Sequence, residues 1–388
     1  MLKYLLTILI LAILILFIFI KIKFQFWSIQ PVFHLYDLHH WFNPNKIINS
    51  KLPSINKYIN LIDIDTFDVK KCPENILENI CAFIKANYLR SKYTEYLPDK
   101  NDILLYLQTI NSSSFVSIYW DKSMNEKNII ATISCRPMYI TFKNKPTFTV
   151  NYIDNLTVEK NKRKSGIAPR LIQTHHYHIR HLNTNNKICL FKREGNMTAI
   201  IPLTTYNTSS YDVNTVLKIK NNLKKTTITS LIKINKTNFS FFKDEIKDAV
   251  KKYTLQVNIE LTTLYTLILS NKIIIYCSIF ESKTHSFYIY RNTPSIIDNK
   301  YDCMELICSI NNSHYIDDFL QGFLSSLKRV YKKYNILRLF IEETADNTIL
   351  VQQFKNYNIS AITNSPTAFF LYNYAAYSLP PKECIFLY

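Results

Sequence analysis

The order of helical and strand-like patterns is the feature that most limits what this 388-residue chain can fold into. Apolar residues recur at helical spacing from Pro73 to Leu89, and strand-like runs that end at Val158 follow them. A second helical stretch, Ala168 to Leu182, then leads into another strand. The same order of helix, strands, helix and strand returns after about residue 216. Alternation of this kind is typical of mixed α/β folds, so we predict two α/β halves, 24–215 and 216–388.

An apolar run from Tyr4 to Ile20 precedes these patterns, with Thr7 as its only non-aromatic polar member. Its length is at the short end of the roughly 17–25 residues that span a bilayer. Lys21 and Lys23 follow directly, where a signal peptide would have a small-residue cleavage site. We therefore predict a transmembrane anchor over residues 1–23. The basic residues after it predict a single-pass protein whose body faces the cytoplasm.

Composition favours a packed protein, because 47% of the residues are hydrophobic. The net charge of +18 is also found in nucleic-acid-binding proteins. Abundant Lys, Asn, Ile and Tyr beside only 3 Gly are, however, typical of an A+T-rich coding sequence. We therefore interpret the charge as solvated surface and expect no nucleic-acid partner. The 8 cysteines form no C-x-x-C pair, which favours free thiols over disulfides or a zinc site.

A basic loop joins the strand that ends at Val158 to the helix that follows, and it carries one of the three glycines. The N-terminus of a helix binds anions through its free N–H groups and its dipole. Gly166 lets the backbone approach a phosphate closely, and Arg163 and Lys164 add positive charge. The loop is a candidate phosphate site; a basic turn that binds no ligand is the alternative.

Four blocks carry a resemblance that extends over more than 300 residues. In chain order they are Phe24-Gln-Phe-Trp-Ser-Ile-Gln-Pro-Val32, Asn155-Leu-Thr-Val158, Arg163-Lys-Ser-Gly-Ile-Ala-Pro169 and Phe370-Leu-Tyr-Asn-Tyr374. In order and spacing they resemble the eukaryotic N-myristoyltransferase family of the GNAT superfamily. The resemblance implies two tandem GNAT-like halves around a saddle-shaped mixed sheet, in an α/β (α+β) fold. It also implies a monomeric enzyme that moves myristoyl or a similar acyl group from acyl-CoA, its co-substrate, to the N-terminal glycine of a protein, without a metal.

The resemblance also assigns roles to individual residues. The backbone N–H groups of Asn155 and Leu156 would form the oxyanion hole, Asp154 would hold the substrate ammonium, and the terminal carboxylate of Tyr388 would be the base. The residues expected to bind acyl-CoA are Gln25, Phe26, Trp27, Arg163, Lys164, Ser165, Gly166, Ile167 and Ala168. Two alternatives stay open: the aromatic segment after the anchor is a membrane-interface belt, or the apolar chain end is an ordinary edge strand.

Three positions depart from the family pattern. Asp154 replaces an Asn and Arg193 replaces a Thr, and in the family both of these groups help to hold the substrate ammonium. We hypothesise that Asp154 and Arg193 pair with each other. The stretch from Leu89 to Lys92 is basic where the family is acidic, which predicts a preference for acceptor peptides that are acidic or neutral after the glycine.

Four histidines, at positions 175, 176, 178 and 181, follow the basic loop. We interpret them as a solvated helix face, with a metal pair at His175 and His178 as the alternative. Two other functions compete with the enzyme that the resemblance implies. One is a non-catalytic membrane protein that binds acyl-CoA or lipid, and the other is a GNAT enzyme with a different acyl donor.

Overall fold

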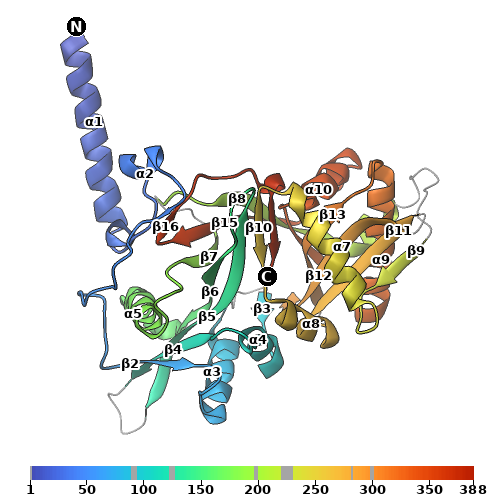
Figure 1. The fold of residues 1–388 in the computed structure, drawn as a ribbon, viewed down its shortest axis with the longest axis horizontal. Coiled ribbons are helices and arrows are strands. Elements are labelled where there is room, and N and C mark those ends of the chain that lie inside the picture. The colour runs from blue at the N-terminus through green and yellow to red at the C-terminus, as the bar shows by residue number, and fades with distance from the viewer. Residues whose placement is uncertain are drawn as a thin grey trace.

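The structure, a computed structural model, describes residues 2–88, 94–121, 127–195, 200–219, 230–280, 283–297 and 301–388. A long mixed sheet runs through the body of the protein, and helices lie on both of its faces (Figure 1). This confirms the mixed α/β fold. The described helices are α1 Leu2–Lys23, α2 Leu38–Phe42, α3 Glu74–Asn87, α4 Lys100–Leu107, α5 Ile167–Leu182, α6 Val213–Leu217, α7 Phe239–Ala249, α8 Leu261–Leu269, α9 Ile316–Tyr334 and α10 Asn347–Asn356. The described strands are β1 Lys46–Ile47, β2 Ile64–Asp68, β3 Thr94–Tyr96, β4 Phe115–Asp121, β5 Asn128–Phe142, β6 Phe148–Val158, β7 Cys189–Glu194, β8 Thr204–Asp212, β9 Ser230–Lys233, β10 Leu255–Asn258, β11 Ile273–Phe280, β12 Lys283–Ile297, β13 Tyr301–Asn311, β14 Arg338–Glu342, β15 Thr363–Tyr372, β16 Tyr374–Ala375 and β17 Cys384–Leu387.

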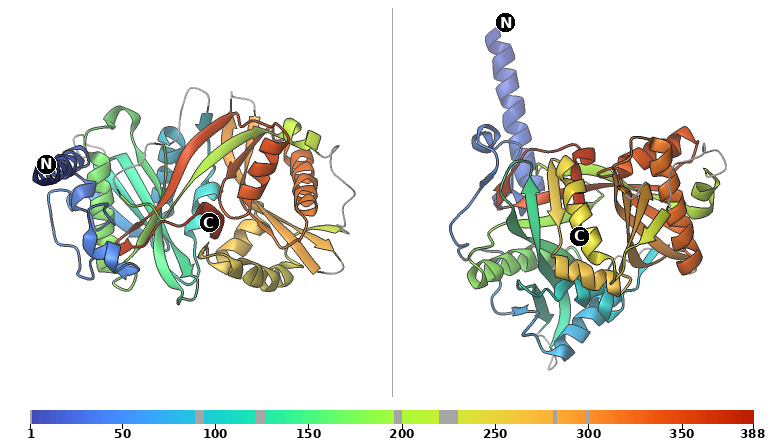
Figure 2. Two further views of the ribbon diagram at one scale, coloured as in Figure 1. Left: turned by 90° about the horizontal axis from the view of Figure 1, so that it is seen from above. Right: turned by 45° about the vertical axis from the view of Figure 1, so that its right-hand side comes forward.

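The main sheet interleaves strands from distant parts of the chain. Its described strands follow the order β17-β10-β5-β6-β7-β15-β8-β14-β13-β12-β11-β9. β10 lies antiparallel beside β5, with Leu255 opposite Phe142, and β15 lies between β7 and β8. Strands that follow residue 216 therefore complete the ladder of the first half, as the view from above shows (Figure 2). The split at 215/216 stays a prediction, since one continuous sheet contains both halves.

Strand β5 is continuous from Asn128 to Phe142, with Pro137 inside it. Its neighbour on one side changes at this proline: β4 pairs with β5 up to Cys135, and β10 begins pairing at Tyr139. Pro137 thus lies where that side has no ladder partner, so its missing N–H group removes no hydrogen bond there.

Amphipathic helices bury one face each against the sheet. In α9, Phe319, Phe323 and Leu327 recur every fourth residue and are fully buried in the core cluster that includes β12 residues. In α5, Leu171 and Ile179 are fully buried beside β4 and β5. Burial of such side chains stabilises the fold by about 1.5–3 kcal/mol each. The position of α5 on the sheet also sets the place of the basic loop before it.

The beginning of the body and the end of the chain lie together. Asn373 N donates to Pro31 O at 2.6 Å, and the Tyr372 hydroxyl donates to Gln30 Oε1 at 2.7 Å. Val32 forms an antiparallel bridge with Tyr372. The first and last blocks of the family resemblance, separated by more than 300 residues in sequence, are thus in direct contact.

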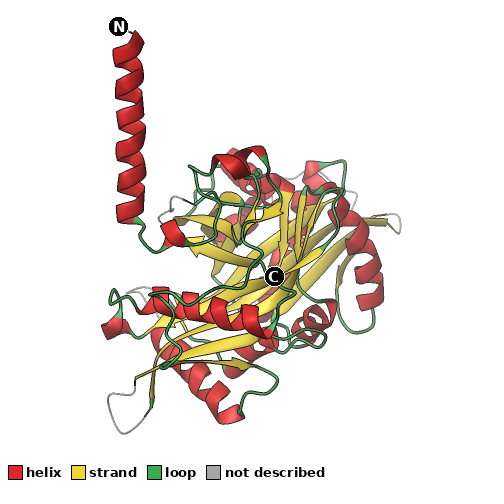
Figure 3. Cartoon of the chain, turned by 60° about the vertical axis from the view of Figure 1, so that its left-hand side comes forward, coloured by secondary structure: helices red, strands yellow, loops and turns green. Residues whose placement is uncertain are grey.

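Helix α1 projects away from the body (Figure 3). Its residues Tyr4–Lys23 have a mean hydropathy of 3.2, and none of that apolar window is buried. Among the described residues this is the one helix long and apolar enough to cross a membrane. The segment after it contains a 3-10 turn at Trp27–Ile29 that ends before Pro31. The turn directs Trp27 back toward the sheet.

Candidate active site

A cavity of about 1000 Å³ extends between the two halves of the sheet. Trp27 and Arg163 line it on the side of α5, and Tyr388 lines it on the side of the later strands. Asn155 and Leu156 of β6 also line it. The volume is within the range of ligand sites that enclose most of a bound molecule. One cavity thus brings Arg163 of the predicted phosphate loop, the predicted oxyanion residues and the chain end to the same space.

A β-bulge in β6 shapes the middle of this cavity. Ser134 pairs with Asp154 and Thr132 pairs with Thr157, so Asn155 and Leu156 together lie opposite one residue of β5. Asn155 has a φ of 54°, in the left-handed region that Asn tolerates better than most residues. Its side chain is anchored by a 2.9 Å hydrogen bond from Nδ2 to Ser134 Oγ. The bulge removes two backbone groups from the regular ladder register beside the cavity.

Asp154 is held by two donors. Its Oδ1 accepts the N–H of Asn155 at 2.8 Å, and its Oδ2 accepts Nη1 of Arg136 at 3.1 Å. Arg136 is buried, and its guanidinium lies 4.9 and 4.7 Å from the ring centroids of Tyr106 and Tyr152. The hypothesis that Asp154 pairs with Arg193 is therefore wrong, because Arg136 from the neighbouring strand takes that position.

Arg193 also lines the cavity but forms no ion pair with any described residue. Its side chain is half-buried, and this burial lowers the pKa of its guanidinium. A guanidinium nevertheless stays protonated in proteins. The cavity therefore contains a partly desolvated cation without a counter-charge among the described residues. The basic stretch from Leu89 to Lys92 lies outside those residues.

The basic loop has left-handed backbone at two positions. Lys164 and Gly166 have φ values of 65° and 80°, and α5 begins directly after them. Successive turns of this kind point N–H groups toward one region. Arg163 connects the loop to β6 and to the end of α3. Its Nε donates to Val158 O at 3.2 Å, and its Nη2 donates to Asn87 O at 2.6 Å. Lys164, Ser165 and Gly166 remain exposed.

Trp27 joins the anchor segment to the sheet. Its ring is stacked on Phe191, with 5.5 Å between centroids, and Phe191 is stacked on Phe370. Phe26 lies edge-on to both Trp27 and Tyr58. The segment is therefore packed on the body as one wall of the cavity, while Gln25 is exposed.

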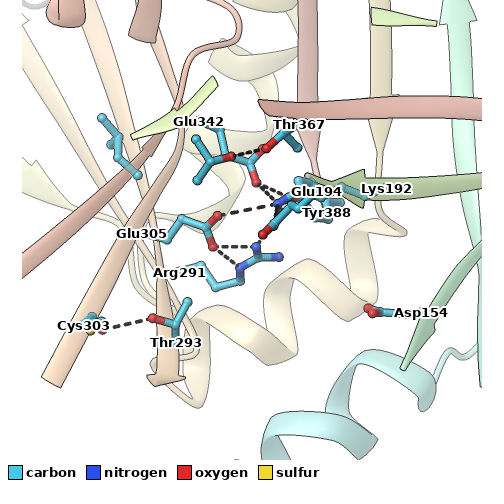
Figure 4. Close-up of polar contacts among 12 residues, drawn as sticks. Asp154, Lys192, Glu194, Arg291, Thr293, Cys303, Glu305, Glu342, Thr367 and Tyr388 are labelled. Carbon is cyan, nitrogen blue, oxygen red and sulfur yellow. Dashed lines mark hydrogen bonds and ion pairs between the residues drawn. The ribbon is translucent and has the colours of Figure 1, made fainter. Parts of the chain in front are cut away.

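A cluster of four charged side chains surrounds the ring of Tyr388 (Figure 4). Lys192 Nζ lies 2.6 Å from Glu342 Oε1, and Arg291 Nη2 lies 2.5 Å from Glu305 Oε2. The hydroxyl of Tyr388 donates to Glu342, and the Arg291 guanidinium lies 4.6 Å from the Tyr388 ring centroid. Two cations and two carboxylates thus balance around a buried aromatic ring.

Burial and charge act in opposite directions on the two carboxylates. Burial alone would raise the pKa of Glu305, but Arg291 and Lys192 outweigh it and hold that pKa at about 2. For Glu342, burial dominates and raises the pKa, although Lys192 opposes the change. The two acids therefore have pKa values shifted in opposite directions beside the chain end.

Comparison with known proteins gives a clear result for the fold. No protein-family model and no curated protein sequence matches the chain. Three solved structures of Saccharomyces cerevisiae N-myristoyltransferase with bound myristoyl-CoA, one of them also with inhibitors, superpose with a TM-score of 0.69. The chain has the N-myristoyltransferase fold. Identity is 14–16%, while the superposition covers 92% of this chain and 90–94% of the yeast chains.

Within the N-myristoyltransferase fold, the predicted site residues divide into two groups. Asp154, Asn155, Leu156, Tyr388, Trp27 and Arg163 line one cavity. The other predicted residues are neighbours in sequence of Trp27 or Arg163 but do not line it: Gln25, Phe26, Lys164, Ser165, Gly166, Ile167 and Ala168. Of these, Ile167 is buried at the start of α5.

The histidine interpretation is wrong for two of the four residues. His175 and His176 are buried, and burial lowers the pKa of each to about 3. His175 Nδ1 lies 2.7 Å from Ser117 Oγ, and His178 Nδ1 lies 2.7 Å from Thr66 Oγ1. The described residues contain no group of three or more potential metal ligands.

Sequence reasoning did not find the charged cluster around Tyr388. One signal was present, since Glu305 lies in the otherwise apolar run Cys303-Met-Glu-Leu-Ile-Cys308. A carboxylate at such a position is rarely buried without a partner. Its partner Arg291 is on the adjacent strand β12, directly opposite it in register.

Proposed function

We propose that this protein is a membrane-anchored acyl-CoA-dependent N-acyltransferase. It moves a myristoyl group, or an acyl chain of similar length, from CoA to the N-terminal glycine amine of a protein. The observation that carries the proposal is the single cavity that Trp27, the bulge at Asn155 and Leu156, and Tyr388 line together. The likeness to yeast N-myristoyltransferase supports it at the level of the fold.

The acyl-CoA half of the site is supported by the loop before α5 and by the aromatic segment. Lys164, Gly166 and the first turn of α5 present exposed N–H groups and positive charge to the CoA phosphates. Trp27, stacked on Phe191, covers the cavity next to them. This arrangement orients the thioester toward the bulge, and orientation alone supplies a large part of such a rate enhancement.

The acceptor half contains the groups for amine attack. The carboxylate of Asp154, 32% exposed, holds the ammonium of the incoming glycine. The terminal carboxylate of Tyr388 removes a proton, and the amine attacks the thioester carbon. The C–S bond then breaks, and the CoA sulfur leaves with the electron pair and takes the second proton of the amine nitrogen. The bulge backbone offers N–H groups to the oxyanion, although that of Asn155 is free for this only when Asp154 releases it.

Helix α1 supports the membrane part of the proposal. It is unburied, and it leads into Trp27 with almost no linker. Lys21 and Lys23 at its end favour a body on the cytoplasmic side. The site then lies at the bilayer surface, where a lipidated product partitions. The protein acts as a monomer, since one chain provides both halves of the cavity.

The test is an acylation assay with the full-length protein in detergent micelles. Myristoyl-CoA and a peptide that begins with Gly should give a peptide heavier by one myristoyl group, together with free CoA thiol. The same peptide with an acetylated glycine should give neither. Bound acyl-CoA without any product would instead favour the non-catalytic binding protein, for which the Asp154–Asn155 hydrogen bond is the specific support.

A further inference from the structure

The hydrogen bond within the bulge has a consequence for catalysis. Asp154 Oδ1 occupies the N–H of Asn155, while Oδ2 is held by Arg136. Arg136 is 2% exposed and its guanidinium contacts two aromatic rings, so it holds the Asp154 carboxylate in one position. A thioester oxygen that approached the Asn155 N–H would come close to the Asp154 carboxylate. Negative charge develops on that oxygen during the reaction. Two adjacent negative charges repel, so this amide is a poor oxyanion donor here.

Arg193 is placed to supply the missing donor. Strands β6 and β7 run parallel, with Ile153 opposite Phe191. Two residues further along each strand are Asn155 and Arg193, and both line the cavity. Because side chains alternate along a strand, Arg193 lies on the same face as Phe191, on which Trp27 is stacked. In the proposed function, acyl-CoA reaches the bulge from this face.

The charges of the cavity leave Arg193 as a cation without a partner. Each acidic side chain that lines the cavity has a basic partner: Asp102 with Lys272, Asp154 with Arg136, Glu194 with Lys192, and Glu305 with Arg291. Arg163 donates to two backbone carbonyl groups. Arg193 makes no such contact within the described part of the chain. A half-buried cation of this kind gains most from an anion that forms during the reaction.

We propose that the guanidinium of Arg193, together with the N–H of Leu156, stabilises the oxyanion of the tetrahedral intermediate in place of the N–H of Asn155. The inference rests on the proposed function. When the amine nitrogen attacks, the C=O electron pair moves to oxygen, and Arg193 donates to that oxygen. When the carbonyl re-forms, the C–S bond breaks and its electron pair leaves with the CoA sulfur. Before the attack the ammonium gives one proton to the terminal carboxylate, and after the attack the nitrogen gives a second proton to the departing sulfur, so the products are the amide and free CoA thiol.

The test compares Arg193→Gln and Arg193→Lys with the wild type in full-length protein. Loss of one oxyanion donor typically lowers kcat by about 10²–10³-fold, and we expect a loss of that size for Arg193→Gln. Arg193→Lys should keep more activity, because it retains the charge. The KM values for peptide and acyl-CoA should change less than about threefold, since the contact forms only in the transition state. Arg329→Gln in α9, outside the cavity, is the matched control.

Two further measurements separate this role from a structural one. A thioether analogue of myristoyl-CoA has no carbonyl oxygen, so wild type and Arg193→Gln should bind it equally. Asp154→Ala frees the Asn155 N–H, so Arg193→Gln should cost about tenfold less kcat in that background than in the wild type. An unchanged kcat in Arg193→Gln would overturn this inference but leave the proposed function in place. A raised KM for acidic peptides, with no change in kcat, would do the same. A wild type that binds acyl-CoA but never transfers the acyl group would overturn the proposed function as well.

Discussion

Arg136 Nη1 donates to Asp154 Oδ2 at 3.1 Å, across two adjacent strands. The two side chains differ in exposure, 2% for Arg136 and 32% for Asp154. The buried partner is also held by the rings of Tyr106 and Tyr152, so the position of the exposed carboxylate depends on the arginine. This pair sets the local charge beside the bulge.

Removal of the arginine should therefore cost more stability than removal of the carboxylate charge. We expect Arg136→Met to lower the free energy of unfolding by about 2–3 kcal/mol, less than for a fully buried pair because Asp154 contacts solvent. Asp154→Asn should cost less than about 1 kcal/mol, since its amide oxygen still accepts from Arg136. Denaturant unfolding of both variants checks the order, and the reverse order would contradict it.

Lys192 compensates a carboxylate that is completely buried. Lys192→Met leaves Glu342 with hydroxyl donors but without its nearest cation, and we expect a loss of about 3–5 kcal/mol in the free energy of unfolding. The double variant Lys192→Met with Glu342→Gln removes the uncompensated charge and should recover at least half of that loss. Equal stability of the single and double variants would show that charge is not the cause.

Stability should depend on pH through His176. Burial lowers its folded pKa to about 3, whereas an unfolded histidine has a pKa near 6.5. Its contribution is therefore fully present above about pH 6.5 and is lost as pH falls toward 3. Between those values, His176→Phe should reduce the slope of unfolding free energy against pH by about 1.4 kcal/mol per unit. Unfolding of the wild type and His176→Phe, followed at several pH values between about 3 and 6.5, checks this, and equal slopes would contradict it.

Gly166 tests the backbone of the loop that we propose binds the CoA phosphates. Its φ is 80°, and a Cβ there would meet no atom within 4 Å, so any cost of substitution is conformational. We expect Gly166→Ala to lower stability by about 1 kcal/mol and to weaken acyl-CoA binding, measured by calorimetry. Gly166→Asn should retain more of both, because Asn tolerates this conformation. Gly195→Ala is the control, with a φ of 84° but a place outside the loop.

The sequence predicted the elements better than the contacts. Periodicity located α3, α5 and the strand that ends at Val158, because each has a long, regular pattern. Short elements such as β10 and α8 were missed, since their four to nine residues hold too little pattern. The family resemblance assigned the oxyanion role to Asn155 and Leu156, which stays a prediction; the structure places a β-bulge at these two residues.

The pairing of charges, by contrast, depends on register, which a single sequence does not contain. Asp154 was matched with Arg193, but the ladder puts Arg136 within reach of it instead. The same limit hid the pair of Arg291 and Glu305, which are opposite each other only after β12 and β13 align. Residues at turns and bulges with left-handed backbone, such as Asn155, were equally beyond periodicity.

The interleaved sheet also determines when the protein can fold. As the chain leaves the ribosome, β5 and β7 are made before their partner strands. β5 can pair with β10 only after Leu255–Asn258 is made, and β7 can pair with β15 only after Thr363–Tyr372 is made. Until then the first half has an open apolar edge, which is prone to pair with other chains. Proteins whose contacts join residues far apart in sequence also fold slowly. Synthesis of the N-terminal half alone therefore yields an unfinished sheet, because two of its strands still lack a partner.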